Sequence, residues 1–109
     1  MKIQFLESSN QGLRWMKEYY KNNPQLDHKK AFENFLQTQL LLCQQPFSGN
    51  KYENFDDIRE LKIPKSNFSI LYAHKRNTIF VIDIRDQRGL RSGIALKEFN
   101  LRLRKKYSL

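Results

Sequence analysis

The chain has 109 residues, among them twenty Lys and Arg but only eleven Asp and Glu, which gives a formal net charge of +9 at pH 7. This length suits one domain with one modest core, so we treat residues 1–109 as a single domain. Its 39% hydrophobic and 13% aromatic residues exclude a wholly disordered chain. The charge favours an anionic partner: nucleic acid, a ribosomal or polymerase-type complex, or an acidic protein.

Cysteine content and hydropathy indicate the compartment. Cys43 is the single cysteine in the sequence, which excludes an intramolecular disulfide and is typical of a reducing cytosol. No apolar stretch approaches the roughly 18 residues of a membrane span, and the start of the chain lacks the apolar segment of a signal peptide. The sequence therefore predicts a cytoplasmic protein.

The first predicted elements are a short strand and a helix. Residues 2–5 alternate between polar and apolar, which is typical of a strand. Ser8 and Gln11 follow with the spacing of a helix capping box, so we expect a helix to begin there.

Within that helix, two neighbouring stripes are rich in large side chains. Leu13, Met16 and Tyr20 recur at helical spacing, and Trp15 and Tyr19 lie on the adjacent stripe. The simplest interpretation of this surface is a packing face.

A second helix follows closely and should form an antiparallel hairpin with the first. Asn23 is suited to cap it, and Pro24 is suited to its first position because that position needs no donor. Pro46 predicts that the helix ends near Gln45. One face of the helix carries Phe32, Phe35, Leu36, Leu40 and Cys43.

The middle of the chain predicts a surface loop and then an antiparallel meander. Residues 46–57 are rich in turn formers and lack periodicity. Three strand-like segments follow, at Ile58–Ile63, Phe68–His74 and Thr78–Ile84.

Both faces of these strands carry apolar residues, so we expect one face to be covered and the other to be functional or partly covered. Strict alternation places four residues on one side of the last strand, namely Ile79, Val81, Asp83 and Arg85.

The C-terminal part begins with an arginine-rich turn. Arg85, Arg88 and Arg91 surround Gly89. Ile94–Tyr107 then shows Leu96, Phe99 and Leu103 at helical spacing, which predicts a third, amphipathic helix. The predicted fold is therefore α+β: an N-terminal strand, a helical hairpin packed on an antiparallel sheet, and a C-terminal helix.

Common catalytic and cofactor motifs are absent from the sequence. His28 and His74 lie on different elements without a ligand cluster, so we expect no metal and no cofactor. Arginine side chains can bind phosphate or carboxylate in a bidentate fork, which makes residues 85–91 a candidate anion-binding segment. The alternative, of equal weight, is that Arg85 or Arg88 pairs internally with Asp83 or Asp86.

Several segments together resemble the ParE/RelE toxin superfamily across about residues 2–92. In chain order they are Trp15 with Tyr19-Tyr20, Asn23-Pro24, Pro46-Phe47-Ser48-Gly49, Arg59-Glu60-Leu61, Phe68-Ser69-Ile70-Leu71-Tyr72 and Val81-Ile82-Asp83-Ile84-Arg85-Asp86-Gln87-Arg88. Their order fits the β-α-α-β-β-β plan reached from periodicity.

The resemblance implies a toxin neutralised by a separately encoded antitoxin, whose acidic, often disordered C-terminal segment folds across the toxin. On this basis we assign antitoxin binding to the first helix, at Leu13, Trp15, Met16, Tyr19 and Tyr20. We assign target binding to Arg59, Arg85, Arg88 and Arg91.

Two activities occur in the superfamily: RelE-like members cut mRNA on the ribosome, and ParE-like members poison DNA gyrase. The RelE-like enzymes place an Arg where Ser69 stands. They also place a Tyr shortly after the last strand, whereas the first Tyr after that strand in this chain is Tyr107. We therefore favour a non-enzymatic gyrase inhibitor. A RelE-like endoribonuclease that recruits Arg59, Lys62, Arg85, Arg88 or His74 is the first alternative, and a non-toxic basic nucleic-acid-binding module is the second.

Overall fold

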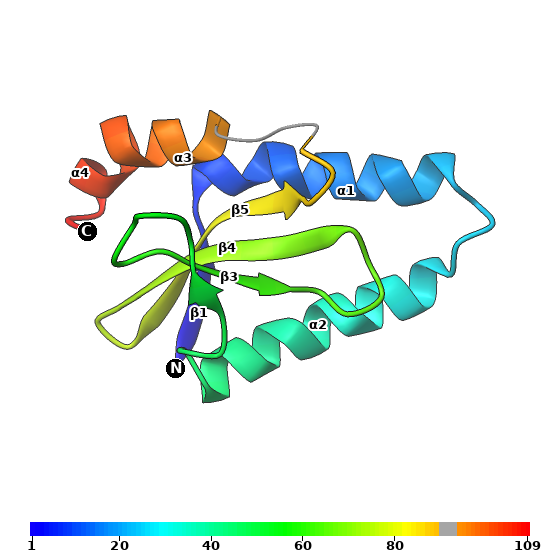
Figure 1. Ribbon diagram of the computed structural model, residues 1–109, viewed down its shortest axis with the longest axis horizontal. Helices are drawn as coiled ribbons and strands as arrows, with labels where there is room; N and C mark the ends of the chain where they lie inside the picture. The colour runs from blue at the N-terminus through cyan, green and yellow to red at the C-terminus, as the bar shows by residue number, and fades with distance from the viewer. Residues whose placement is uncertain (90–93) are drawn as a thin grey trace.

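A five-stranded sheet lies at the centre of the computed structural model, which describes residues 1–89 and 94–109 (Figure 1). The strands are β1 (Lys2–Phe5), β2 (Asn50–Lys51), β3 (Arg59–Lys62), β4 (Phe68–Lys75) and β5 (Thr78–Asp86). Their spatial order is β1-β5-β4-β3-β2. The predicted meander is confirmed, but the sheet is mixed because β1 pairs parallel to β5, and β2 lies inside the predicted loop.

Two helical units flank this sheet. A 3-10 turn, η1 (Glu7–Ser9), leads into α1 (Asn10–Asn22), which runs antiparallel to α2 (His28–Gln44) (Figure 1). The C-terminal unit is one helical run, made of α3 (Ile94–Glu98), the π-helical η2 (Phe99–Leu103) and α4 (Arg104–Lys106). It confirms the predicted third helix. No helix in residues 1–89 or 94–109 is both long and apolar enough to cross a membrane.

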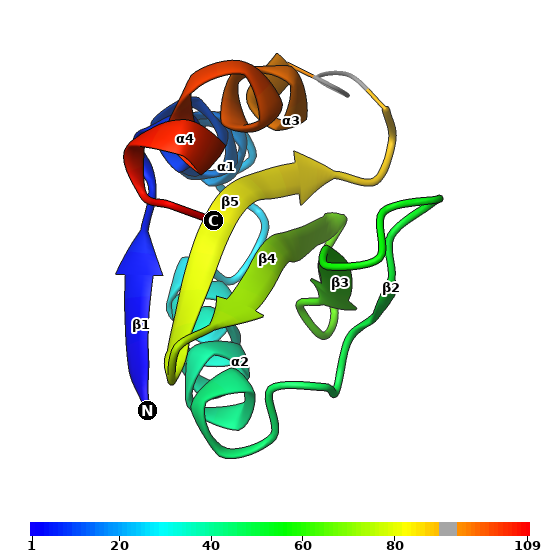
Figure 2. The ribbon, with the colours of Figure 1, turned by 90° about the vertical axis from the view of Figure 1, so that its left-hand side faces the viewer.

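Figure 2 shows the helices above and below the strands. Two hydrophobic cores form between these layers. The core on the side of the hairpin contains Phe35, Leu42, Ile63, Phe68, Ile70, Tyr72, Ile79, Val81 and Ile84. The core on the side of the C-terminal helices contains Leu6, Tyr52, Ile58, Leu71, Ala73, Phe80, Ile82, Leu96, Phe99 and Leu103. The C-terminal helices pack on this second face at β5, while side chains of β3 stay partly exposed there, as the expectation of a partly covered face allows.

An irregularity in β5 changes which side chains share a face. Leu71 pairs with Asp83 while its neighbour Tyr72 pairs with Val81, so Ile82 is an extra residue, as in a β-bulge. From Asp83 onward, the residues of β5 therefore point to the opposite face from the one that strict alternation predicts. The prediction that Asp83 and Arg85 share a side with Val81 is wrong for this reason.

The helix starts also differ from those predicted. Ser8 lies in η1, and its buried hydroxyl donates to the carbonyl of Ile82 (2.6 Å), while α1 begins at Asn10. Asn23 follows the end of α1, and its side chain donates to the carbonyl of Tyr19 (2.6 Å). The cap of α2 is Asp27, whose carboxylate accepts from the backbone N–H of Lys30 (3.0 Å).

Candidate partner-binding site on the helical hairpin

An apolar groove runs between α1 and α2. Its volume is about 480 Å³, and its lining consists mainly of large carbon-rich side chains: Leu13, Met16, Lys17, Tyr20, His28, Ala31, Phe32, Phe35, Ile63 and Ser66. Leu13, Met16 and Tyr20 come from the first of the two predicted stripes of α1. Because the groove is open, its apolar side chains remain in contact with water in the described chain. A partner that filled the groove would bury them, which is favourable.

The outer side of α2 extends this apolar surface. Phe32, Leu36 and Leu40 lie at i, i+4 and i+8, and they are 62%, 42% and 55% exposed. Phe35 and Leu42 are buried against the sheet instead. The face predicted from periodicity is therefore divided, since only Phe35 of the five residues reaches the core. We call Phe32, Leu36 and Leu40 the α2 row.

The second stripe of α1 has a different role, because it is joined to the end of β5. The indole N–H of Trp15 donates to Asp86 (2.8 Å), and the guanidinium of Arg88 donates to both oxygens of the same carboxylate (3.0 and 2.7 Å). The Arg88 guanidinium also lies over the Tyr19 ring, 4.6 Å from its centre. The hydrogen bonds from Arg88, together with that from Trp15, lower the pKa of Asp86 to about 2, although burial opposes this.

Comparison with known proteins identifies the fold. No protein-family model and no curated protein sequence matches the chain. Its structure is similar to a chain in the solved structure of the chromosomal ParDE toxin–antitoxin system from P. aeruginosa, with a TM-score of 0.62 and 18% sequence identity. The match covers 79% of this chain and 95% of that chain. The chain has a ParE-like fold.

Within the ParE-like fold, Arg85 lies on the side of the C-terminal helices. Its guanidinium forms an ion pair with Glu60 (2.7 Å) and lies 5.6 Å from the centre of the Tyr52 ring. The hydroxyl of Ser69 donates to the same oxygen of Glu60. A bound anion would therefore have to compete with Glu60 for the Arg85 guanidinium.

Arg59 occupies a third position, at the loop between α2 and β2. Its guanidinium donates to the carbonyl of Gly49 (2.8 Å) and lies over the Phe47 ring at 5.1 Å. The buried hydroxyl of Tyr72 holds the same loop, because it accepts from the Gly49 N–H (3.0 Å) and donates to the Pro46 carbonyl (2.8 Å).

The ParE-like fold thus separates the arginines that we assigned to target binding. Arg59, Arg85 and Arg88 lie at three sites, each with an internal partner, and Arg91 lies outside the described residues. Of the assigned antitoxin-binding residues, Leu13, Met16 and Tyr20 line the groove, while Trp15 and Tyr19 belong to the Asp86 network. In residues 1–89 and 94–109, no three His, Cys, Asp or Glu side chains gather as metal ligands would.

Proposed function

We propose that the chain is the toxin of a toxin–antitoxin pair, and that an acidic antitoxin neutralises it by covering the groove and the α2 row. The observation that carries the proposal is the ParE-like fold, whose hairpin presents a continuous apolar surface to solvent. Monomeric proteins seldom leave three large apolar side chains in a row exposed beside an open apolar groove. The chemistry of the surface therefore favours a protein partner.

An amphipathic helix is the expected form of the bound antitoxin segment. A helix places apolar side chains at i, i+3, i+4 and i+7, a spacing suited to fill a groove between two other helices. The net charge of +9 favours acidic residues on its other face. Phe32 lines the groove and begins the α2 row, so one helix could contact both.

For the cellular target we propose DNA gyrase rather than ribosome-bound mRNA. Cleaving RNA through its 2′-hydroxyl needs a base or an activated hydroxyl, and a cation for the charge that develops on phosphorus. Ser69 stands where RelE-like enzymes have an Arg, and Glu60 neutralises Arg85 beside it. Inhibition of gyrase by binding requires no such groups.

The test is to assay the purified chain in parallel for inhibition of gyrase supercoiling and for cleavage of mRNA on programmed ribosomes. We expect inhibited supercoiling and intact mRNA. Cut mRNA would overturn the choice of gyrase and leave a toxin. If expression does not arrest growth and neither assay responds, the toxin proposal fails in favour of a non-toxic basic binding module.

The separation of the arginines allows the target-facing surface to be found with single variants. Arg59→Gln, Arg85→Gln and Arg88→Gln each remove one charge from a different site, and Arg91→Gln tests the fourth candidate. We expect at least one of them to reduce gyrase inhibition about tenfold or more while the chain stays folded. Full inhibition by all four folded variants would exclude these arginines from the target contact.

A further inference from the structure

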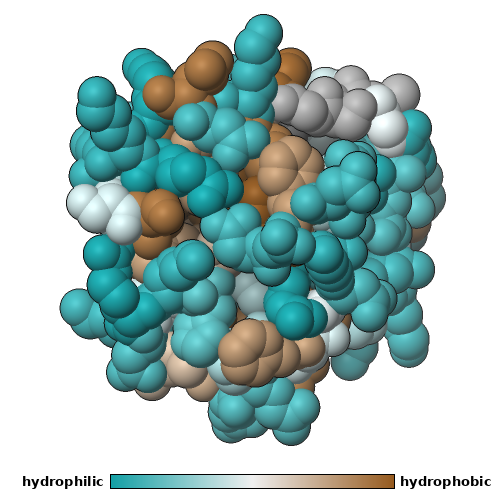
Figure 3. Space-filling view, turned by 60° about the vertical axis from the view of Figure 1, so that its left-hand side comes forward, coloured by the Kyte–Doolittle hydropathy of each residue, from teal (hydrophilic) through white to brown (hydrophobic). Residues whose placement is uncertain are grey.

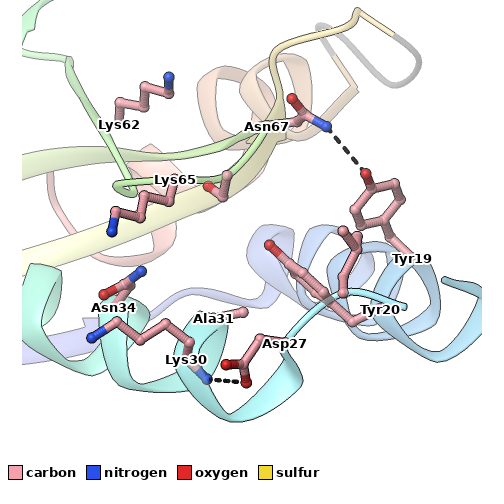
Figure 4. Close-up of a pocket in the computed structure, with 11 residues that line it drawn as sticks. Tyr19, Tyr20, Asp27, Lys30, Ala31, Asn34, Lys62, Lys65 and Asn67 are labelled. Atoms are coloured by element: carbon pink, nitrogen blue, oxygen red, sulfur yellow. Dashed lines mark hydrogen bonds between the residues drawn. The ribbon is translucent and has the colours of Figure 1, made fainter. Parts of the chain in front are cut away.

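A second pocket, of about 420 Å³, opens between the α1–α2 connection and the turn that joins β3 to β4 (Figure 4). We call it the lysine pocket, because Lys30 from α2, Lys62 from β3 and Lys65 from the turn line it. One carboxylate, that of Asp27, lies at its edge and accepts the backbone N–H of Lys30 as the cap of α2 (3.0 Å). The charged side chains around the pocket are therefore positive in excess.

The three lysines have no internal counterion within the part of the chain that is described. Lys51, Lys75 and Lys106 pair with carboxylates, but in residues 1–89 and 94–109 no such ion pair involves the lysines of the pocket. Their charges are therefore available to an anion from outside.

Neutral donors complete the lining. The side chain of Asn34 is anchored by its hydrogen bond to the carbonyl of Pro64 (3.2 Å), and the ammonium groups of Lys30 and Lys65 reach toward it in Figure 4. The Tyr20 hydroxyl points into the pocket in the same view. Burial raises the pKa of Tyr20, so this hydroxyl keeps its proton at neutral pH and can donate it to an acceptor.

The lysine pocket and the apolar groove adjoin each other. Tyr20, Ala31 and Ser66 line both of them. A segment seated in the groove would therefore have the lysine pocket beside Tyr20, within reach of a side chain that projects from its end.

We propose that the lysine pocket binds the carboxylate of an Asp or Glu from the protein segment that fills the groove. The inference rests on the proposed function and adds where the acidic character of the antitoxin is recognised. Apolar contacts hold the segment on one side of Tyr20, and charge-assisted hydrogen bonds from Lys30 and Lys65 hold it on the other. The combination fixes the register of the segment along the hairpin.

A peptide carboxylate suits this site better than the phosphate backbone of a nucleic acid. A backbone bears a charge at every nucleotide and needs a track of cations. The lysine pocket leads instead into the groove. There the apolar side chains of Leu13, Met16 and Phe32 would displace water from a phosphate and could not replace the hydrogen bonds that this water makes. One carboxylate on an otherwise apolar surface avoids that cost.

The experiment measures how tightly four forms of the full chain bind the purified product of the gene that adjoins its own. The native chain is compared with Lys30→Gln/Lys65→Gln in the pocket and Phe32→Ser in the groove. Lys21→Gln/Lys29→Gln is the matched control, because it also removes two positive charges, from exposed positions on α1 and α2 that line neither cavity. A 20-base-pair DNA duplex serves as the second ligand.

We expect the pocket variant to bind the adjoining product at least tenfold more weakly than the control does, with no comparable difference on DNA. Equal losses in pocket variant and control would overturn the carboxylate site and leave only diffuse attraction, and a selective loss of DNA binding would assign the pocket to nucleic acid. If the native chain does not bind the product, or if Phe32→Ser binds as well as the native chain, the proposed antitoxin surface itself fails.

Discussion

On one face of the sheet the C-terminal helices close over the core, whereas on the other face the hairpin leaves a groove. The C-terminal unit is fastened at several points, because Arg104 pairs with Asp57 (2.6 Å), Lys106 pairs with Glu7 (2.6 Å), and Arg76 donates to the carbonyl of Tyr107 (2.8 Å). Figure 3 shows one end of the molecule, where hydrophilic side chains cover most of the surface and hydrophobic side chains form separate islands. The hairpin instead exposes its apolar residues contiguously.

The contrast shows that amphipathic helices can serve opposite purposes in one small domain. Both units carry an apolar stripe that packs on the sheet. The hairpin also carries the α2 row, which the described chain leaves exposed beside the groove, and we attribute that row to a partner.

The closed face should be sensitive to the loss of a core side chain. Phe99 is fully buried among the C-terminal core, and Phe99→Ala should lower the free energy of unfolding by about 3–5 kcal/mol, because a cavity replaces the ring. Urea denaturation followed by circular dichroism measures the change. A loss below about 1 kcal/mol would mean that the C-terminal helices contribute little to the fold.

Substitutions on the open face should weaken partner binding and change the free energy of unfolding only slightly. Phe32→Ser combined with Leu36→Ser should weaken binding of the adjoining gene product about thirtyfold or more, because central apolar contacts dominate interfaces. The free energy of unfolding should change far less than in Phe99→Ala, by about 1 kcal/mol or less, since the two side chains are 62% and 42% exposed. Leu101→Ser is the control, because Leu101 is 70% exposed but lies on the C-terminal unit. An equal loss of affinity from Leu101→Ser would contradict the division.

Much of the architecture could be predicted because it depends on local patterns. Period-two stretches located β3, β4 and β5, and helical spacing located the hairpin and the C-terminal helix. The parallel pairing of β1 with β5 could not be read in this way, since 76 positions separate Lys2 from its partner Thr78. The two-residue strand β2 carries too little pattern to detect.

The candidate sites were less predictable because single residues decide them. One extra residue, Ile82, turns Arg85 toward Glu60 and Asp86 toward Trp15, and nothing in the alternation marks it. The lysine pocket combines residues from α2, β3 and a turn, so only the folded chain brings them together. The α2 row had a visible signal, because Phe32, Leu36 and Leu40 widen the apolar face of α2 beyond the width that its contact with the sheet buries.

The smallest predicted effect concerns acid stability, and it compares one carboxylate on each side of the sheet. Asp86 is buried with Arg88 and Trp15, and Asp57 is partly exposed with Arg104. The pKa of Asp86 is about 2 in the folded chain, below the ordinary value of 3.8 that it regains on unfolding. The ionised carboxylate therefore adds to the free energy of unfolding above about pH 4, and this stabilisation is lost as the pH falls toward 2. At about 1.4 kcal/mol for each pKa unit, the loss should reach about 2 kcal/mol. The hydrogen bond from Arg104 also lowers the pKa of Asp57, but its partial exposure screens the pair.

Asp86→Asn should therefore be less stable than the native chain at pH 7 and should lose less stability between pH 4 and pH 2. Asp57→Asn should differ less from the native chain at both ends of this range, because water already screens its pair. Urea midpoints measured at half-unit pH steps distinguish the two variants. If Asp86→Asn loses as much stability on acidification as the native chain does, the bonds from Arg88 and Trp15 do not hold Asp86 ionised in the folded chain.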